Sequence, residues 1–128
     1  MTEYKQLTPV EHELMEILWK IKEGTVHDVM NLLPNDRHLA YTSVSTILRI
    51  MQQKKVLTIK KSGRTHIYQP LLSKENHASH SIRKILKQVF SGNSVNLVAH
   101  LVNEEKLSHD ELNKIQALID AKKKELPK

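Results

Sequence analysis

The spacing of the apolar residues changes twice along the chain, and this constrains the fold more than any other feature. Up to residue 55 the apolar residues recur at intervals of three and four, as on one face of a helix. Residues 56–70 instead place β-branched side chains on either side of a Ser-Gly turn, which is typical of two strands. From Ser73 onward the helical spacing returns. We therefore expect a mainly α-helical protein with a small β-hairpin.

Three helices are expected before the hairpin, at about residues 9–22, 26–33 and 42–54. Thr8 and Glu11 have the spacing of a capping box, in which each side chain accepts from the backbone amide of the other residue. Thr25 and Asp28 repeat this spacing at the start of the second helix. Gly24 is expected to end the first helix.

The strands are expected at about residues 56–61 and 64–70. Three helices followed by a β-hairpin is the order of a winged helix-turn-helix, whose third helix enters the major groove of DNA. We therefore assign residues 1–73 to a winged helix-turn-helix DNA-binding domain.

The charges of the chain are segregated. Residues 37–74 contain eight Lys and Arg and no Asp or Glu, whereas residues 1–36 contain three basic and seven acidic side chains. The acid-free block spans the third helix and the hairpin, where carboxylates would repel phosphates. Together with a net charge of +6, this predicts double-stranded DNA as the partner.

The third helix has an apolar side, which can dock on its own domain, and a polar side without acids. Short hydroxyls allow close approach to DNA, and Arg49 can reach a phosphate or make two hydrogen bonds to guanine. For this helix alone, a merely solvated face explains the composition about equally well. The helix order and the charge segregation favour DNA.

Three aromatic residues are expected to have mainly structural roles. Trp19 packs the first helix and Tyr68 packs under the hairpin. Tyr41 either touches a phosphate or packs beside the third helix.

Residues 74–128 are expected to form a C-terminal helical dimerisation domain. A segment this small makes only a marginal core, so its apolar stripes are best buried against a second copy. The alternative is that these helices pack on the N-terminal domain of the same chain. The predicted dimer residues are Ile82, Ile85, Leu86, Val89, Leu97, Leu101, Leu112, Ile115 and Ile119.

Composition excludes several classes of function. Without cysteine there is no disulfide, zinc–cysteine site or thiol catalysis, and a reducing cytoplasm is the expected compartment. The chain lacks an apolar run long enough for a membrane span and the pattern of a signal peptide.

The sequence leaves two alternatives to a DNA-binding protein. His77 and His80 have a helical spacing that can bind Zn²⁺ or Ni²⁺, but no convincing third ligand follows them. We therefore expect that the protein is not an enzyme and holds no cofactor or metal. The first alternative is a regulator that responds to a metal bound by these histidines. A winged helix that binds protein is the other, and it should bind without strong salt dependence.

Three stretches resemble the penicillinase-repressor family of BlaI/MecI/CopY type: LTPVEHELMEILW, TSVSTILRIMQQKKVL and GRTHIYQPLLSKE. The resemblance extends over nearly the whole chain and is strongest in its first 75 residues. It implies a homodimeric transcriptional repressor that recognises an inverted-repeat operator, of a β-lactam-resistance or related stress operon, and dimerises through its C-terminal helices.

The resemblance also implies DNA-contacting residues. On the third helix they are Thr42, Ser43, Ser45, Thr46 and Arg49, and on the hairpin they are Lys61, Arg64 and His66. Lys55 stands where the family usually has a glycine, and it adds a cation near the phosphates.

The signal that would release this repressor from DNA is expected to differ from the signals of well-known family members. Copper-responsive members carry paired C-terminal cysteines, which this chain lacks. Members that respond to β-lactams are cleaved at an Asn-Phe bond, and His100-Leu101 is the corresponding pair here. A regulatory protease therefore remains one candidate partner, and release by a ligand remains the other route.

Overall fold

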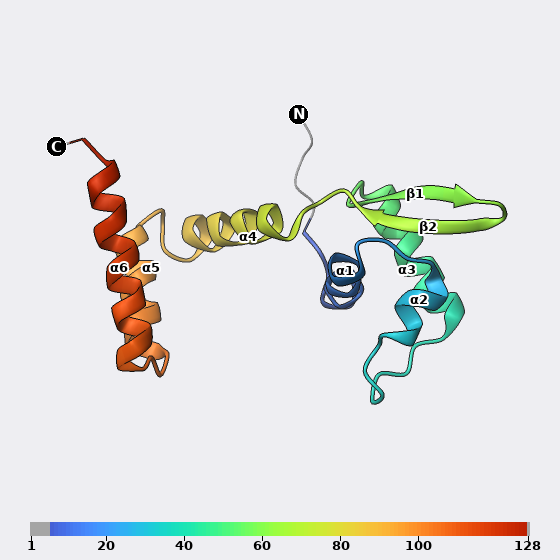
Figure 1. Cartoon of the computed structure of the whole chain (residues 1–128), viewed down its shortest axis with the longest axis horizontal. Coiled ribbons are helices and arrows are strands. Elements are labelled where there is room, and N and C mark those ends of the chain that lie inside the picture. The colour runs from blue at the N-terminus through green and yellow to red at the C-terminus, as the bar shows by residue number, and fades with distance from the viewer. Residues whose placement is uncertain (1–5, 128) are drawn as a thin grey trace. The chain divides into compact units, whose positions relative to one another are not determined.

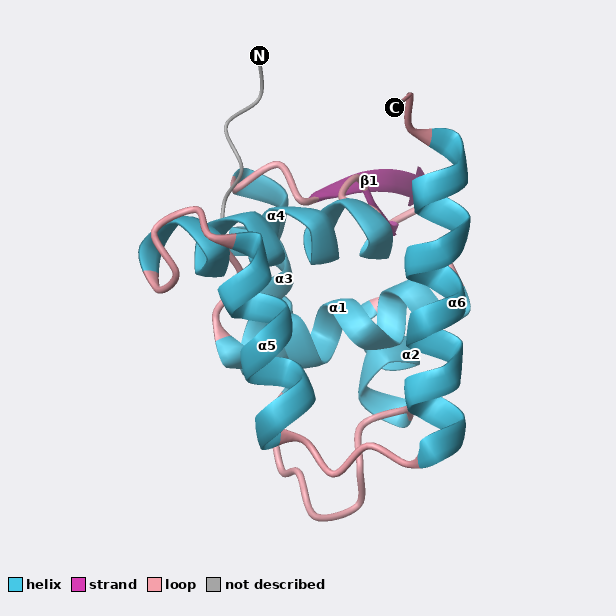
Figure 2. Cartoon of the chain, turned by 90° about the vertical axis from the view of Figure 1, so that its left-hand side faces the viewer, coloured by secondary structure: helices cyan, strands magenta, loops and turns pink. Residues whose placement is uncertain are grey.

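The computed structural model describes residues 6–127, which are mainly helical with one two-stranded antiparallel sheet (Figures 1 and 2). The elements are α1 (Pro9–Ile21), α2 (Val26–Asn31), α3 (Tyr41–Gln53), β1 (Leu57–Ser62), β2 (Thr65–Pro70), α4 (Lys74–Gln88), α5 (Ser94–Glu104) and α6 (His109–Glu125). The chain divides into two compact units between Ser81 and Ile82, within α4. The boundary expected from the sequence lies at the start of the same helix.

Both predicted capping boxes form, and they set where α1 and α2 begin. Thr8 N–H donates to Glu11 Oε1 at 2.9 Å, and Glu11 N–H donates to Thr8 Oγ1 at 3.2 Å. Thr25 and Asp28 exchange the equivalent bonds at 2.9 and 3.1 Å. Each box satisfies backbone donors that the first turn of a helix leaves without partners.

The prediction that Gly24 ends α1 is wrong. The helix ends at Ile21, and Lys22 follows with φ of 78°. Gly24 instead pairs with Tyr68 of β2, with backbone N–O distances of 3.0 and 2.8 Å. A Cβ on Gly24 would lie 2.7 Å from Ile21 Cδ1 and 3.1 Å from Asp28 Cβ, so a side chain here would crowd α1 and α2.

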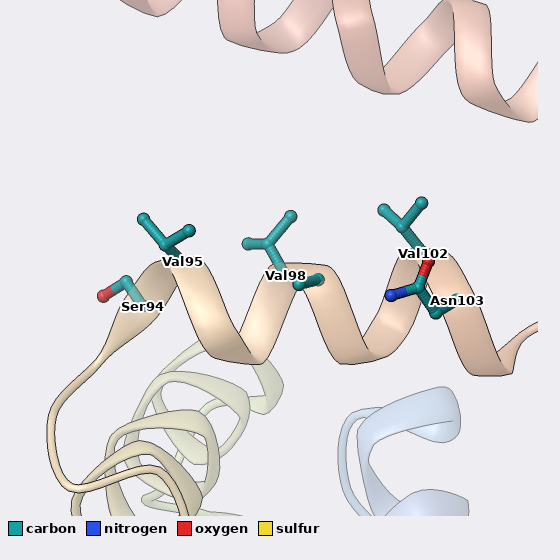
Figure 3. A pocket seen from close by; sticks show the side chains of 6 residues that line it. Ser94, Val95, Val98, Val102 and Asn103 are labelled. Carbon is teal, nitrogen blue, oxygen red and sulfur yellow. The ribbon is translucent and has the colours of Figure 1, made fainter.

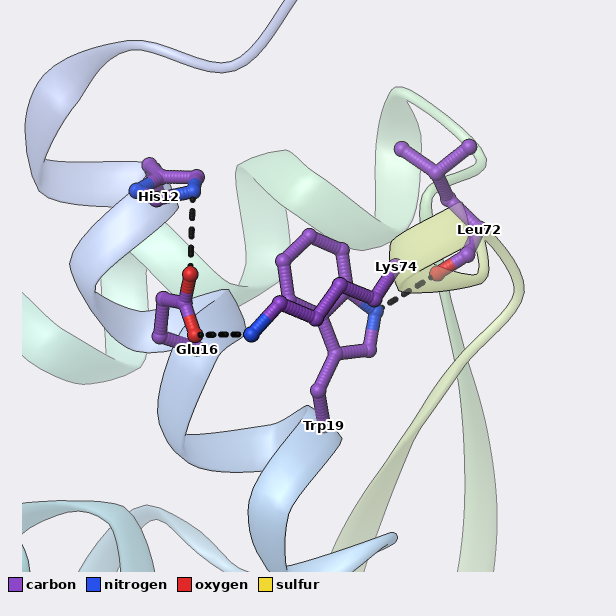
Figure 4. Close-up of polar contacts among 5 residues, drawn as sticks. All are labelled: His12, Glu16, Trp19, Leu72 and Lys74. Atoms are coloured by element: carbon purple, nitrogen blue, oxygen red, sulfur yellow. Dashed lines mark hydrogen bonds and ion pairs between the residues drawn. The ribbon is translucent and has the colours of Figure 1, made fainter. Parts of the chain in front are cut away.

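The N-terminal unit has one apolar core, to which α1, α2, α3 and the hairpin all contribute. Its fully buried members include Leu14, Leu18, Val29, Leu48 and Leu57. Tyr68 is buried at the base of the hairpin, as predicted. Trp19 lies at the edge of the core, where its indole Nε1 donates to the Leu72 carbonyl at 2.8 Å (Figure 4).

The C-terminal unit has no comparable core. None of the described residues of α4, α5 and α6 is buried in the single chain. Helices α5 and α6 run antiparallel (Figure 2). No helix within residues 6–127 is long and apolar enough to cross a membrane.

Candidate nucleic-acid interface

Helix α3 separates its apolar and polar sides as the sequence predicts. Val44, Leu48 and Met51 are fully buried against the rest of the N-terminal unit. The predicted DNA contacts on the helix are exposed or, for Ser45, half-buried: Thr42, Ser43, Ser45, Thr46 and Arg49. The polar side is therefore available to a partner.

The turn after α3 is made by a lysine in an unusual conformation. Lys55 has φ of 67°, a left-handed backbone that glycine adopts more easily than any other residue. Its N–H donates to the Gln52 carbonyl at 3.0 Å, which closes the turn before β1. The turn is thus made without glycine, and it carries an exposed cation.

Ion pairs decide which of the eight basic residues in 37–74 remain available. Three of them pair with carboxylates of α1 at N–O distances of 2.7 to 3.4 Å: Lys54 with Glu11, Arg37 with Glu13 and Lys74 with Glu16. The other five have no ion pair with any residue in the range 6–127: Arg49, Lys55, Lys60, Lys61 and Arg64. Within residues 37–74, the basic side chains without an ion pair therefore all lie on α3, in the turn after it or on the hairpin.

The pair between Glu11 and Lys54 is the most buried of these. Glu11 is only 4% exposed, and its Oε1 accepts both from Lys54 Nζ at 2.7 Å and from Thr8 N–H at 2.9 Å. Burial favours the neutral carboxyl, but the hydrogen bonds and the charge of Lys54 outweigh it and lower the pKa of Glu11. Lys54 thus belongs to the fold.

The hairpin presents its polar residues along an exposed tip. Lys61 and His66 are register partners in β1 and β2, so they share one face of the hairpin. Lys60 precedes Lys61 and points to the opposite face. Arg64 lies in the turn, beside Gly63 with φ of 64°. All four polar side chains are exposed.

A polar pocket of about 350 Å³ lies where α2, α3 and the hairpin meet. Its lining residues are Thr25, Val26, His27, Tyr41, Ser45, Arg64, Thr65, His66 and Tyr68. Three of the predicted DNA contacts come together there, namely Ser45, Arg64 and His66. The remaining predicted contacts do not line it: Thr42, Ser43, Thr46, Arg49, Lys55 and Lys61.

His27 and Tyr41 also line this pocket, and of these only Tyr41 was considered from the sequence as a residue that touches a phosphate. The rings of His27 and Tyr41 lie 4.8 Å apart. Tyr41 is one helical turn before Ser45, so its spacing in the sequence pointed to the same side of α3. His27 carries no such signal, because only the folding of α2 against α3 brings it here.

The two histidines considered for metal binding have other surroundings. The ring of His77 lies 5.4 Å from that of His12 and 5.6 Å from that of Trp19. Burial and the neighbouring His12 and His80 lower the pKa of His77, and Glu16 opposes them. Across residues 6–127 the structure contains no group of three His, Cys, Asp or Glu placed to hold a metal.

Helix α5 presents an apolar face that was missing from the predicted dimer residues. Val95, Val98 and Val102 point to the same side and line a pocket of about 490 Å³ (Figure 3). Val95 is 77% exposed in the single chain. The predicted residues are also only partly covered, since Ile82, Ile85, Val89, Leu101, Leu112 and Ile119 are exposed and Leu86, Leu97 and Ile115 are half-buried.

The His100-Leu101 pair lies in the interior of α5. Leu101 is 50% exposed, and the ring of His100 lies 5.8 Å from that of Phe90. The peptide bond between them is part of a regular helix.

Comparisons with known proteins agree with this architecture. The sequence profile of the penicillinase repressor family matches residues 7–121. The chain is 21% identical to the penicillinase repressor of Bacillus licheniformis over 123 residues, which cover 96% of each protein. It is 20% identical to the methicillin resistance regulatory protein MecI of Mammaliicoccus sciuri over 117 residues, 91% of this chain and 95% of MecI.

Solved structures match the fold of the N-terminal part. The solution structure of the DNA-binding domain of the repressor BlaI superposes with a TM-score of 0.52 at 24% identity, covering 59% of this chain and 93% of that domain. The monomeric form of Bacillus licheniformis BlaI, in complex with the blaP half-operator, gives a TM-score of 0.50 at 24% identity. The N-terminal unit has the winged helix-turn-helix fold, and the chain belongs to the penicillinase repressor family.

Proposed function

We propose that the protein is a homodimeric transcriptional repressor that binds an inverted-repeat operator in double-stranded DNA. The observation that carries this proposal is that the acid-free block leaves five basic side chains without an ion pair within residues 6–127, all on α3, in the turn after it or on the hairpin. Cations held apart from carboxylates are free to release counterions from phosphates. The names of the relatives and the half-operator bound to BlaI support the same conclusion.

In this proposal α3 lies in the major groove and the hairpin follows the backbone. The hydroxyls of α3 approach base edges and phosphates, and Arg49 reads guanine or binds a phosphate. Lys55, Lys61, Arg64 and His66 make contacts with the backbone. A winged helix that binds protein is the alternative function. It is disfavoured, because a protein-binding surface would not need α3 and the hairpin to lack carboxylates.

The dimer is proposed because the C-terminal unit cannot bury its apolar side chains by itself. The valine face of α5 and the predicted stripes of α4 and α6 stay largely exposed in one chain. A second copy related by twofold symmetry would cover them and would place two α3 helices about 34–36 Å apart, on successive major grooves.

Regulation is proposed to act on the same unit. The relatives' names point to an operon of β-lactam resistance or a related stress response. A protease acting at His100-Leu101 would have to open α5 first, because the bond lies within a helix. Sequencing of bound genomic fragments identifies the controlled genes. Measuring DNA binding by the purified repressor with candidate β-lactams distinguishes release by a ligand from release by cleavage, because only a ligand acts without a protease.

Salt dependence tests the DNA-binding proposal. Duplexes selected from a randomised pool should bind with an affinity that falls steeply with salt, with a log–log slope of up to about −4.5 per subunit if all five unpaired cations contact phosphates. Arg49→Ala should weaken binding by about 1–3 kcal/mol, whereas Arg83→Ala on α4 should leave it unchanged. Failure to retain any duplex, or retention that ignores salt, contradicts the proposal.

A further inference from the structure

The polar pocket between α2, α3 and the hairpin is lined almost entirely by polar and aromatic side chains, including residues outside the predicted DNA contacts. Among its nine lining residues only Val26 is aliphatic, and none is acidic. The lining includes the guanidinium of Arg64, the imidazoles of His27 and His66, and the hydroxyls of Tyr41 and Ser45. These groups can donate hydrogen bonds, and they come from three segments of the chain: α2, α3 and the hairpin.

The charged and titratable groups nearby preserve this donor character. The Asp28 carboxylate of α2 is held in the capping box, where its Oδ2 accepts from Thr25 N–H at 2.9 Å. Burial raises the pKa of Tyr68, with Arg49 opposing and Tyr41 adding to the effect, so the Tyr68 hydroxyl keeps its proton. No lining side chain offers a carboxylate that would repel an anion.

We infer that this pocket seats one backbone phosphate of the bound DNA duplex, and that His27 and Tyr41 help to hold it. The inference rests on the proposed function and adds α2 to the elements that contact DNA. The source of the phosphate follows from position, because Ser45, Arg64 and His66 belong both to the pocket and to the predicted DNA-contacting surface. Its volume of about 350 Å³ also leaves room for the sugar attached to the phosphate.

Seating one phosphate at this junction would fix the depth and angle of α3. Contacts with phosphates position a protein on the duplex without reading sequence. A phosphate bound at once by α2, the start of α3 and the hairpin tip ties the three elements to a single point of the backbone. His27 and Tyr41 therefore act as positioning residues for the base contacts further along α3.

The test measures coupling between single phosphates and the two residues. Each phosphate of a selected duplex is replaced in turn by a neutral methylphosphonate, and the affinity is measured for the wild type and for a His27→Ala, Tyr41→Phe double variant. We expect one replacement per half-site to weaken the wild type about tenfold, and the double variant to be weakened about equally on the unmodified duplex. For the double variant, the same replacement should lower the affinity by less than about twofold relative to the unmodified duplex.

Two controls accompany the measurement. His109→Ala, on exposed α6, should respond to every replacement as the wild type does. If thermal unfolding shows that the double variant is destabilised, Tyr41→Phe alone serves instead, because it removes only a hydroxyl.

The outcomes separate the two proposals. If every replacement weakens the wild type and the variant by the same factor, the pocket is not the phosphate seat, while the DNA-binding proposal stands. If the wild type binds no duplex, both fall. Inorganic phosphate should compete with the duplex no better than chloride at equal ionic strength. Competition specific to phosphate and lost in the variant would assign the pocket to a free anion and overturn the inference.

Discussion

A single residue, Lys55, makes the turn after α3 without glycine. Lys55 occupies a left-handed position with φ of 67°, where its Cβ crowds the backbone. The same residue places a cation at the end of α3. Its backbone conformation is strained, but its charge suits a phosphate partner, so stability and DNA affinity should respond to different substitutions.

Lys55→Gly should stabilise the N-terminal unit by about 0.5–1 kcal/mol, because glycine relieves the left-handed strain and part of this gain is offset by chain entropy. It should also reduce the slope of DNA affinity against salt by about 0.9. Lys55→Ala is the matched control, since it removes the charge and keeps the Cβ. Urea unfolding that ranks alanine with glycine would show that the left-handed backbone is not the source of the strain.

Lys54→Met should destabilise the protein by about 1–3 kcal/mol at neutral pH, because it leaves the buried Glu11 carboxylate without its cation. In the wild type the pKa of Glu11 is lowered, so its stabilising contribution is present above pH 4.5 and is lost as pH falls through its folded-state value. The difference between variant and wild type should therefore shrink in acid. Equal differences at neutral and acidic pH, by urea unfolding, would remove this ion pair from the explanation.

At the scale of elements, the helix starts and the hairpin follow from local rules, and this is why the sequence predicted them. A capping box depends on residues three apart, and the strands depend on side chains flanking one turn. Gly24 was misassigned because a glycine after a helix is usually a cap, whereas here its role depends on Tyr68, far along the chain. The ring contacts of His77 in α4 with His12 and Trp19 in α1 could not be predicted either, because these residues are far apart in the sequence.

Those ring contacts predict a pH dependence of stability. Burial lowers the pKa of His77, so the unfolded chain takes up a proton at a higher pH than the folded one does. Stability is then complete above pH 6.5 and falls as the pH drops toward the lowered folded-state pKa. His77→Phe should keep the contacts with His12 and Trp19 and flatten the change of Tm with pH in this window. His109→Phe is the control, and an unchanged profile in His77→Phe would contradict the assignment.

At the scale of the whole molecule, the two units differ in how they reach stability. The N-terminal unit buries its apolar side chains within one chain, whereas the described helices of the C-terminal unit bury none completely. Apolar stripes of this extent need a partner surface, and the valine face of α5 adds to the residues already expected from the sequence.

Ile85→Asp, Leu101→Asp and Val98→Asp should each convert the proposed dimer to a monomer, because each would bury a carboxylate in its apolar interface. Sedimentation velocity gives the mass, and binding to a two-half-site duplex should weaken with it. Leu32→Asp, an equally exposed position in the N-terminal unit, should leave the mass unchanged. Dimers that persist in all three variants would refute the proposed interface.

The polar face of α3, the hairpin, the caps and the acid-free block could all be inferred from residues close together in the chain, because their physics is local. The number of cations left for DNA could not. It depends on pairs separated by 24, 43 and 58 positions, which only the folded chain brings within hydrogen-bond distance. The pocket likewise combines side chains from α2, α3 and the hairpin, and their meeting point is set by the packing of the core beneath them.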